Sequence, residues 1–320
     1  MRAKIVSTGF YVPPKIETAE DLAPRIGKSA DWILEHTGVA KRHVAEEPME
    51  VMGAKAARQA LGDGPEPDLI LNASTTPRQT IPDSSVFITR ELGYEGLPCH
   101  SIHATCLSFL VALHHAYALV HSGAYRRILV VTSEMGSIAR NWDEPESSVL
   151  LGDAAGAAIV EPTPAGEDAE LLGYRINTWP SGAEYTELPG GGIRRHPNDP
   201  NTRPVDNLFH MDGPAVYKMA RRRAGLVLAQ TLGQAGLKPT DLDLVVPHQA
   251  SGKALKAIPD YGIPEERVVN IVAEYGNCIA ASIPLALAIA HRRGRLKRGN
   301  RLLMAGTGAG LSVGALLVRW

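Results

Sequence analysis

Residues 99–123 read CHSIHATCLSFLVALHHAYALVHSG. A short β-type run at 100–103 is followed, from 107 to 122, by a stretch without Pro or Gly that is typical of a helix. Cys106 stands between the two. Unpaired amides and the helix dipole at a helix start stabilise a thiolate, the nucleophilic form of cysteine. The stretch therefore predicts a strand leading into a helix with Cys106 as a candidate nucleophile, although a free cysteine is often an inert buried thiol.

The same alternation of strand and helix extends on both sides of this stretch. Short β-branched runs predict buried strands at residues 4–7, 68–73, 100–103, 127–132 and 155–160. Helical patterns lie between them at residues 51–61, 84–92 and 107–122. This βαβαβ order predicts a covered, mostly parallel sheet.

The second half of the chain repeats this order. Its predicted strands are residues 243–247, 268–272, 301–305 and 314–318, and its predicted helices are 213–235, 251–260 and 282–292. Three pairs of similar segments indicate a duplication. They are PDLILNAST (67–75) with LDLVVPHQAS (242–251), RRILVVTSE (126–134) with NRLLMAGTG (300–308), and GAAIVEP (156–162) with GALLVRW (314–320). We expect two halves, residues 1–165 and 166–320.

A Gly/Pro-rich insertion, residues 180–207, interrupts the second half. Loops of this length are usually functional or disordered, and the sequence leaves both readings open.

Charge and composition narrow the class of protein. The formal net charge is −1 and the sequence pI is near 6.8, so no global basic field is available for nucleic acid or an anionic membrane. The three cysteines are an odd number, and the N-terminus has no long apolar stretch. The longest apolar run, residues 279–290, is too short to span a bilayer. We expect a cytoplasmic enzyme that binds neither membrane nor nucleic acid.

Two residues of the second half stand where an open α/β sheet presents site residues. His248 follows an apolar strand in LVVPHQAS, and Asn277 lies in a glycine-marked turn in YGNCIAASIP. Taken singly, the first is usually structural and the second an ordinary turn residue. Together with Cys106 they predict thioester chemistry, in which the cysteine attacks an acyl carbonyl and two neutral donors stabilise an enolate oxygen.

Zinc is the competing interpretation of the cysteine segment. Cys99, His100, His103 and Cys106 have metal-binding side chains at short spacing, but no second cluster completes the usual ligand set. On a strand, His100 and His103 would point to opposite faces. We therefore expect no metal site.

Several segments, in order along nearly the whole chain, resemble the ketoacyl-acyl-carrier-protein synthase III family of thiolase-fold enzymes. They are HATCLSFLVAL, LLGDAAGAAIV, FHMDGPAVYKMA, VPHQAS, YGNCIAASIPLAL and MAGTGAGLSVGALLVRW. The resemblance implies a thiolase-like α/β fold in which two duplicated βαβαβ halves pack as α/β/α/β/α layers. It places the nucleophilic cysteine in the first half and the His and Asn in the second, and it implies a homodimer.

The resemblance also implies roles for the three candidate residues. Cys106 would accept the acyl group, while His248 and Asn277 would hold a malonyl thioester carbonyl as carbon dioxide leaves. The backbone amides of Cys106 and Ala309, the latter in GTGAG (306–310), would form the oxyanion hole. The product would be a 3-oxoacyl thioester in fatty-acid initiation or secondary metabolism.

Substrate contacts follow from the same resemblance. Trp32 would flank the outer end of the donor, Ile81 would close the partner subunit's acyl tunnel, and Thr307 and Gly308 would line the substrate site. The implied substrates are thioesters of acyl-carrier protein or coenzyme A, with no other cofactor.

The resemblance also implies a docking surface of basic side chains for an acidic carrier protein. Lys218 and Lys253 resemble the family's carrier-binding positions, and Lys256 and residues 221–223 add charge nearby.

The chain departs from the family pattern in several places, which include Ser251, where Asn is usual, and Ile81, which is often a phenylalanine. His36 replaces an arginine and residues 143–149 lack another, which weakens the case for a coenzyme A donor. Thr307 replaces a phenylalanine associated with malonyl decarboxylation. The alternatives are a non-condensing acyltransferase that uses an alcohol or amine, a quinolone-type condensing enzyme, or an inactive carrier-binding subunit.

Overall fold

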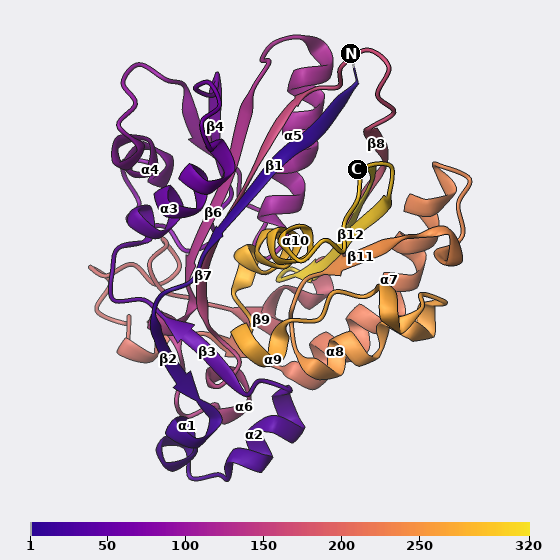
Figure 1. Ribbon diagram of the computed structural model, residues 1–320. Helices are drawn as coiled ribbons and strands as arrows, with labels where there is room; N and C mark the ends of the chain where they lie inside the picture. Colours follow the sequence, from indigo (N-terminus) through magenta and orange to yellow (C-terminus); the bar gives the residue numbers. More distant parts are fainter. Residues whose placement is uncertain (1) are drawn as a thin grey trace.

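The computed structural model describes residues 2–320, and its architecture is built on two main sheets (Figure 1). The first sheet has the strand order β1-β7-β6-β4-β5. Its strands are β1 (Ala3–Tyr11), β4 (Leu69–Asn72), β5 (Cys99–Ser101), β6 (Ile128–Met135) and β7 (Asp153–Pro162). All five strands predicted in this half are present, with somewhat different ends.

The second sheet has the order β11-β12-β13-β8. Its strands are β8 (Glu170–Thr178), β11 (Leu244–Pro247), β12 (Arg301–Gly308) and β13 (Ser312–Arg319). The three pairs of similar segments match β4 with β11, β6 with β12 and β7 with β13, and these strands occupy equivalent places in the two sheets. The predicted duplication is confirmed by this shared order.

Helices fill the space between the sheets and cover their outer faces. The central layer is α5 (Ser108–Ser122) with α10 (Ser282–Arg292), and both contribute to a core cluster shared with the two sheets. The outer face of the first sheet packs on α3 (Met49–Leu61) and α4 (Ser84–Leu92), and that of the second on α7 (Gly213–Gly233). The result is the α/β/α/β/α layering that the resemblance implies.

The strands of the two main sheets are continuous apolar runs because both of their faces are buried. In β4, Leu69 and Leu71 face the central layer, whereas Ile70 faces α3. In β12, Leu302 faces the central layer and Leu303 faces the side of α7. A strand with helices on both faces has no solvent-facing side, so both sets of positions are apolar.

Shorter elements gather at one end of the molecule, in the lower part of Figure 1. They are β2 (Lys15–Thr18), α1 (Ala19–Ile26), α2 (Ala30–Thr37), β3 (Lys41–Val44), α6 (Pro145–Ser148), α8 (Gly252–Lys256) and α9 (Val272–Tyr275). Helices α1 and α2 begin at side-chain caps, Thr18 and Ser29. Backbones of α2 and α8 meet closely, because a Cβ on Gly38 would stand 2.8 Å from the Cα of Gly252.

Three predictions about elements are wrong in part. Residues 268–272 do not form a strand: Val268 makes only an isolated bridge with Val245, and the side chain of Gln249 accepts the hydrogen bond of the Ile271 amide at 2.9 Å. The predicted helix 251–260 is divided into α8 and a 3-10 turn, Ile258–Tyr261. Strand β8 was not predicted.

The sheets are also not mostly parallel. In the two main sheets of the described chain, only three pairs of neighbouring strands are parallel. They are β4 with β5, β4 with β6, and β11 with β12. Strands β12 and β13 pair antiparallel because only residues 309–311 join them, and parallel neighbours need a crossover of about a dozen residues or more.

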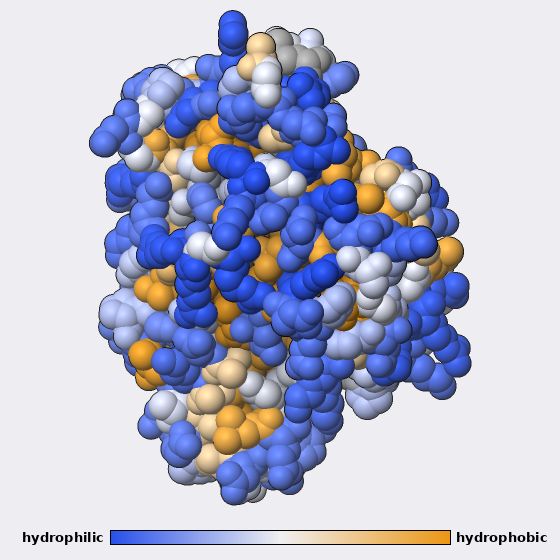
Figure 2. Space-filling model, turned by 45° about the vertical axis from the view of Figure 1, so that its right-hand side comes forward, coloured by the Kyte–Doolittle hydropathy of each residue, from blue (hydrophilic) through white to orange (hydrophobic). Residues whose placement is uncertain are grey.

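The insertion at 180–207 has regular structure near its two ends, and residues 188–203 between them are mostly exposed. It contains 3-10 turns Pro180–Tyr185 and Pro204–Asn207, and its strand β9 (Thr186–Glu187) pairs with β10 (His210–Met211). Figure 2 shows a largely hydrophilic face with hydrophobic residues visible in its recesses. Within residues 2–320, no helix is both long and apolar enough to cross a membrane.

Candidate active site

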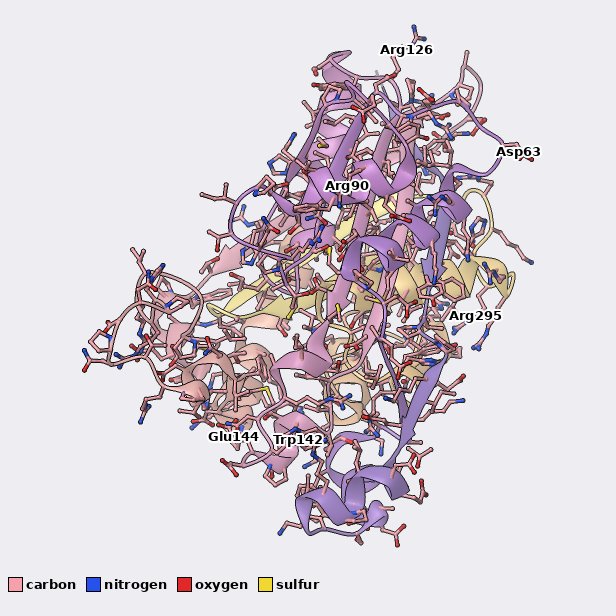
Figure 3. The ribbon with its side chains drawn as sticks, turned by 90° about the vertical axis from the view of Figure 1, so that its left-hand side faces the viewer. Asp63, Arg90, Arg126, Trp142, Glu144 and Arg295 are labelled. Atoms are coloured by element: carbon pink, nitrogen blue, oxygen red, sulfur yellow. The ribbon has the colours of Figure 1, made fainter. Side chains whose placement is uncertain are left out.

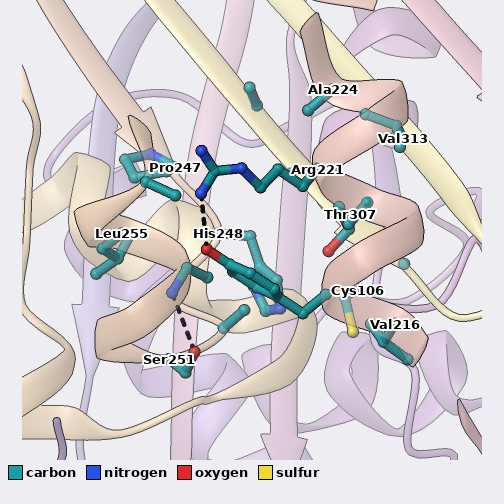
Figure 4. Close-up of a pocket in the computed structure, with 18 of the residues that line it drawn as sticks. Cys106, Val216, Arg221, Ala224, Pro247, His248, Ser251, Leu255, Thr307 and Val313 are labelled. Atoms are coloured by element: carbon teal, nitrogen blue, oxygen red, sulfur yellow. Dashed lines mark hydrogen bonds between the residues drawn. The ribbon is translucent and has the colours of Figure 1, made fainter. Parts of the chain in front are cut away.

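Cys106 lies on a tight turn between β5 and α5. The residue before it, Thr105, has a φ of 50°, an uncommon conformation for a side chain branched at Cβ. Two hydroxyls hold the Thr105 carbonyl, that of Thr75 at 2.9 Å and that of Ser108 at 2.7 Å. Strain of this kind costs about 1–3 kcal/mol and persists only where the surroundings enforce it. The turn thus fixes the thiol at the wall of a cavity (Figure 4).

The expected stabilisation of a thiolate at this helix start is outweighed by burial. Burial raises the pKa of Cys106 to about 12, and the negative charge of Glu134 acts in the same direction. The backbone amides of Cys106 and Ala309 lower this pKa, but by less. Cys106 is therefore a neutral thiol at pH 7. The influence of the Ala309 amide agrees with its predicted place beside the sulfur.

Glu134 is a buried residue of this site that the sequence prediction missed. Its carboxylate accepts hydrogen bonds from the amides of Thr75 (2.5 Å) and Thr76 (3.0 Å) and from the Thr76 hydroxyl (2.8 Å). Burial raises the pKa of Glu134 to about 7. Because Thr75 in turn holds the Thr105 carbonyl, Glu134 supports the turn that carries Cys106. An acidic residue at the end of an apolar strand is the signal that could have identified it.

His248 follows β11 and is held against β12. Its backbone amide donates to the Ala305 carbonyl at 2.8 Å, and a Cβ on Gly306 would stand 2.6 Å from the His248 Cβ. Only glycine allows this approach. Burial lowers the pKa of His248 to about 4, so its ring is neutral at pH 7. Its buried Nδ1 has no hydrogen-bond partner within the described chain.

Asn277 is placed by a turn that requires glycine. Gly276 has a φ of 68°, and a Cβ there would stand 2.6 Å from the Leu150 carbonyl oxygen. The Asn277 amide nitrogen Nδ2 donates to the Ala250 carbonyl at 3.3 Å, and its Oδ1 accepts from the Ile279 amide at 2.9 Å. One Nδ2 hydrogen is left for a ligand. Because Ala250 is two residues from His248, this bond joins the two loops.

One cavity of about 560 Å³ brings these residues together. It is lined by site residues predicted from both halves of the chain: Cys106, His248, Asn277, Thr307, Gly308 and Ala309. Pockets of about 300–1,000 Å³ are typical of small-molecule sites. Residues 2–320 contain no group of three or more His, Cys, Asp or Glu side chains that could hold a metal ion.

The remaining predicted residues lie at or outside the cavity mouth. Lys253 lines the mouth, whereas Lys218 lines a separate hollow beside it. Trp32, Lys256 and Ile81 are not among the lining residues of the main cavity, and Ile81 is 82% exposed.

His36 takes a place at the mouth next to Trp32. The two rings stack with centroids 4.2 Å apart, and the His36 Nδ1 lies 2.9 Å from the Trp32 carbonyl. One face of the Trp32 indole is thus covered by the protein itself. Nearby, Trp142 is covered by Arg25, whose guanidinium lies 3.6 Å from the ring centroid.

Glu144 connects the cavity mouth to β10, the strand that pairs with β9 of the insertion. It lies beside Trp142 on the segment before α6 (Figure 3). Its carboxylate is 2.6 Å from His210 Nδ1 and accepts from the Met211 amide at 3.2 Å. This hydrogen bond raises the pKa of His210. Met211 and its pairing partner Thr186, which belongs to the insertion, both line the cavity, so the insertion contributes to the site.

Comparison with known proteins agrees with this geometry. The family models for 3-oxoacyl-(acyl-carrier-protein) synthase III match residues 101–180 and, for the C-terminal part, 232–320. A beta-ketoacyl-(acyl-carrier-protein) synthase III of Desulfitobacterium hafniense is 34% identical over 323 residues, covering 99% of this chain and 97% of the relative.

Two solved structures are similar over almost the whole chain. The synthase III of Aquifex aeolicus is 33% identical with a TM-score of 0.90, covering 99% of this chain and 100% of its own. A priming beta-ketosynthase from a polyketide biosynthetic pathway is 30% identical with a TM-score of 0.91, covering 99% and 96%. The chain belongs to the beta-ketoacyl-acyl-carrier-protein synthase III family, and it is an acyltransferase of the condensing class with the thiolase-like fold.

Proposed function

We propose that this enzyme transfers an acyl group to Cys106 and then condenses it with a malonyl thioester to give a 3-oxoacyl thioester and carbon dioxide. The observation that carries the proposal is the single cavity onto which a neutral thiol, a neutral imidazole and a carboxamide open. The proposed chemistry needs no resident cofactor.

In the first half-reaction, the Cys106 sulfur attacks the carbonyl of the donor thioester. The thiol proton leaves with the departing donor thiolate, so Cys–SH and the acyl donor become the acyl-enzyme and a free thiol. The amides of Cys106 and Ala309 would stabilise the oxyanion, and their effect on the pKa of the Cys106 sulfur supports this assignment.

In the second half-reaction, malonyl thioester loses carbon dioxide and the resulting enolate carbon attacks the acyl-enzyme. The C–S bond to Cys106 breaks, and the thiolate that is released takes up a proton from water to restore the thiol. Neutral donors on His248 and Asn277 stabilise the enolate oxygen, and no base is required because decarboxylation supplies the carbanion. The free Nδ2 hydrogen of Asn277 supports this role.

Mass spectrometry of the intact protein tests both steps. Wild-type enzyme mixed with an acyl thioester should gain one acyl mass, and Cys106→Ala should gain none. His248→Ala and Asn277→Ala should still be acylated but should release carbon dioxide from malonyl thioester a hundredfold or more slowly, since one such donor is worth about 3 kcal/mol. If the wild type passes its acyl group to an alcohol or amine and leaves malonyl carbon intact, the non-condensing alternative replaces condensation.

We further propose that the donor and the malonyl group arrive on an acyl-carrier protein rather than on coenzyme A, in the cytoplasm. His36 covers one face of Trp32, which reduces the surface on which an adenine could stack. Lys218 on α7 and Lys253 and Lys256 on α8 are exposed around the mouth. Exposed positive charge steers an acidic partner to a site.

Charge reversal separates docking from chemistry. The double variant Lys218→Glu with Lys253→Glu should raise the KM for a carrier-bound substrate at least tenfold, and that for a short pantetheine thioester far less. Lys297→Glu is a matched control, because Lys297 is exposed just before β12, at the opposite end of that strand from the site. Equal effects on both substrates would contradict carrier docking at this surface.

A further inference from the structure

Asn277 is held through its backbone by the segment at residues 149–152. This segment joins α6 to β7 and lies next to β3 and α9 (Figure 1). The Asn277 amide donates to the Leu150 carbonyl at 2.8 Å, and the Asn277 carbonyl accepts from the Gly152 amide at 3.0 Å. Because both backbone bonds are made to this one segment, a shift of the segment would move the Asn277 side chain in the cavity.

Two buried arginines hold this segment in turn. Arg42 Nη2 donates to the Val149 carbonyl at 2.6 Å, and Arg140 Nη2 donates to the Leu151 carbonyl at 2.6 Å. These carbonyls come one residue before and one residue after the carbonyl that bonds the Asn277 amide. The arginines are 0% and 4% exposed, so water does not compete for either bond. Two charge-assisted hydrogen bonds therefore fix the segment on both sides of its contact with Asn277.

The stem of Arg42 also packs against the two turns that meet at Asn277. A Cβ on Gly152 would stand 3.1 Å from the Arg42 Cβ, and a Cβ on Gly276 would stand 3.4 Å from the same atom. Gly152 ends the segment, and Gly276 directly precedes Asn277. Arg42 thus contacts the segment through its guanidinium and both turns through its stem.

A single carboxylate, that of Glu17 on β2, pairs with these two cations in the described chain. Arg140 Nη1 forms a 2.5 Å ion pair with it, and Arg42 Nη1 donates to the Glu17 backbone carbonyl at 3.3 Å. Burial and the nearby charge of Arg140 lower the pKa of Arg42 to about 10, so Arg42 is still charged at pH 7. Apolar side chains often fill such a space at no loss of stability. What a guanidinium adds is a planar set of donors that binds several partners in fixed directions.

We propose that Arg42 and Arg140 are positioning residues for Asn277, which hold its loop so that the free Nδ2 hydrogen meets the enolate oxygen of the malonyl thioester. The inference rests on the second half-reaction of the proposed function. Neither arginine is among the lining residues of the cavity, so both act through residues 149–152. Cys106 is held by other bonds, those of the turn between β5 and α5. Loss of an arginine should therefore slow the second half-reaction and spare the first.

Lysine substitutions test this division. Arg42→Lys and Arg140→Lys keep the positive charge, but a single nitrogen cannot reach both partners that each guanidinium binds. A misplacement of about 1 Å can slow a reaction about a hundredfold. Carbon dioxide release from malonyl pantetheine thioester should fall at least tenfold in each variant. Acylation of Cys106 by acetyl pantetheine thioester, followed by intact mass, should change less than twofold.

Arg267→Lys is the matched control. Arg267 donates to the carbonyls of Thr240 and Leu242, both at 2.6 Å, so it holds backbone in the same way. These carbonyls precede β11, at the opposite end of that strand from His248. Both rates should be unchanged in Arg267→Lys. If Arg42→Lys does not fold, Arg140→Lys still decides the question, because Arg140 is not the residue that packs on the two glycines.

A double substitution separates positioning from a general loss of structure. If Arg140 acts through Asn277, adding Arg140→Lys to Asn277→Ala should slow carbon dioxide release by less than a further twofold, since the donor is already absent. Losses that multiply would overturn the proposal. So would carbon dioxide release that is unchanged in both lysine variants, or acylation that falls as much as carbon dioxide release does.

Amide hydrogen exchange provides a measurement that is independent of catalysis. In Arg140→Lys, the amides of Gly152 and Asn277 should exchange at least tenfold faster than in the wild type, because their segment opens more often. Unchanged exchange would overturn the proposal that the arginines hold this loop. If Asn277→Ala alone leaves carbon dioxide release unchanged, the donor role in the proposed function is refuted. In that case the exchange rates alone decide whether the arginines hold the loop.

Discussion

Burial in the same cavity changes the pKa values of Cys106 and His248 in opposite directions. Burial disfavours whichever form is charged, so it raises the pKa of the thiol to about 12 and lowers that of the imidazole to about 4. At pH 7 both groups are neutral, and no thiolate–imidazolium pair forms in the free enzyme. The nucleophile is then generated only as the donor reacts.

The pH dependence of alkylation tests this neutral pair. The thiolate fraction of a group with a pKa near 12 rises about tenfold for each pH unit below that value. The rate of Cys106 alkylation by iodoacetamide should therefore increase steadily from pH 6 to pH 9, as followed by peptide mass spectrometry. Cys106→Ala supplies the background from Cys99, which is half-buried, and from the buried Cys278. A rate that is level above pH 6 would indicate a preformed ion pair and contradict the neutral state.

The sequence predicted which residues meet at the site better than it predicted their electrostatics. Cys106, His248 and Asn277 were identified from their places at helix starts and from the resemblance, and the structure brings all three to one cavity. Their catalytic roles stay predictions. The expected thiolate was wrong because local position reveals the helix dipole but not the depth of burial, which depends on the whole fold. Glu134 was missed for the same reason.

Some glycines are required because two backbone segments approach closely there. Substitution of Gly306 on β12 tests this requirement. A methyl group there would stand 2.6 Å from the His248 Cβ, so the strand or the histidine must move. Gly306→Ala should lower the free energy of unfolding by about 1–3 kcal/mol, as overpacking typically does. It should also slow carbon dioxide release from malonyl thioester. Urea unfolding and the decarboxylation assay measure the two effects.

Gly225 provides the matched control for that substitution. It lies inside α7, and its Cβ would make only an ordinary contact, 3.6 Å from the Tyr261 ring. Gly225→Ala should raise the free energy of unfolding by about 0.5–1 kcal/mol, because alanine is the better helix former. If both variants were equally stable, close packing of β12 on His248 would not be the reason for glycine at position 306.

Elements with strong local patterns were predicted well, and those set by tertiary contacts were not. Helices 84–92 and 282–292 were predicted with the bounds that the structure has. Strand β8 is an edge strand with mainly half-buried residues, so it lacks a clear period-two signal. The apolar run 268–272 resembles a strand locally, but the Gln249 side chain takes the backbone bond that a neighbouring strand would make.

At the scale of the whole molecule, the duplication explains why the site lies between the two halves. The turn after β5, the parallel neighbour of β4, carries Cys106, and the loop after β11, the counterpart of β4 in the second sheet, carries His248. One half supplies the nucleophile and the other the donors. A boundary between residues 165 and 166 stays a prediction, since α5 and α10 pack in one shared core.

The open edge of the first sheet leads to the last prediction, which is a homodimer. Strand β5 pairs with β4 only, so its outer side has unpaired backbone groups, and such edges favour pairing with another chain. Ile81, which the resemblance places at the partner's acyl tunnel, and Ile138 are 82% and 75% exposed, so both side chains are accessible to a second copy of the chain. Light scattering at micromolar concentration should give twice the chain mass of 34.3 kDa. Ile81→Glu with Ile138→Glu should shift the protein toward monomer, whereas Leu226→Glu, on the outward side of α7, should not. A wild type that is monomeric and fully active at this concentration would exclude the dimer.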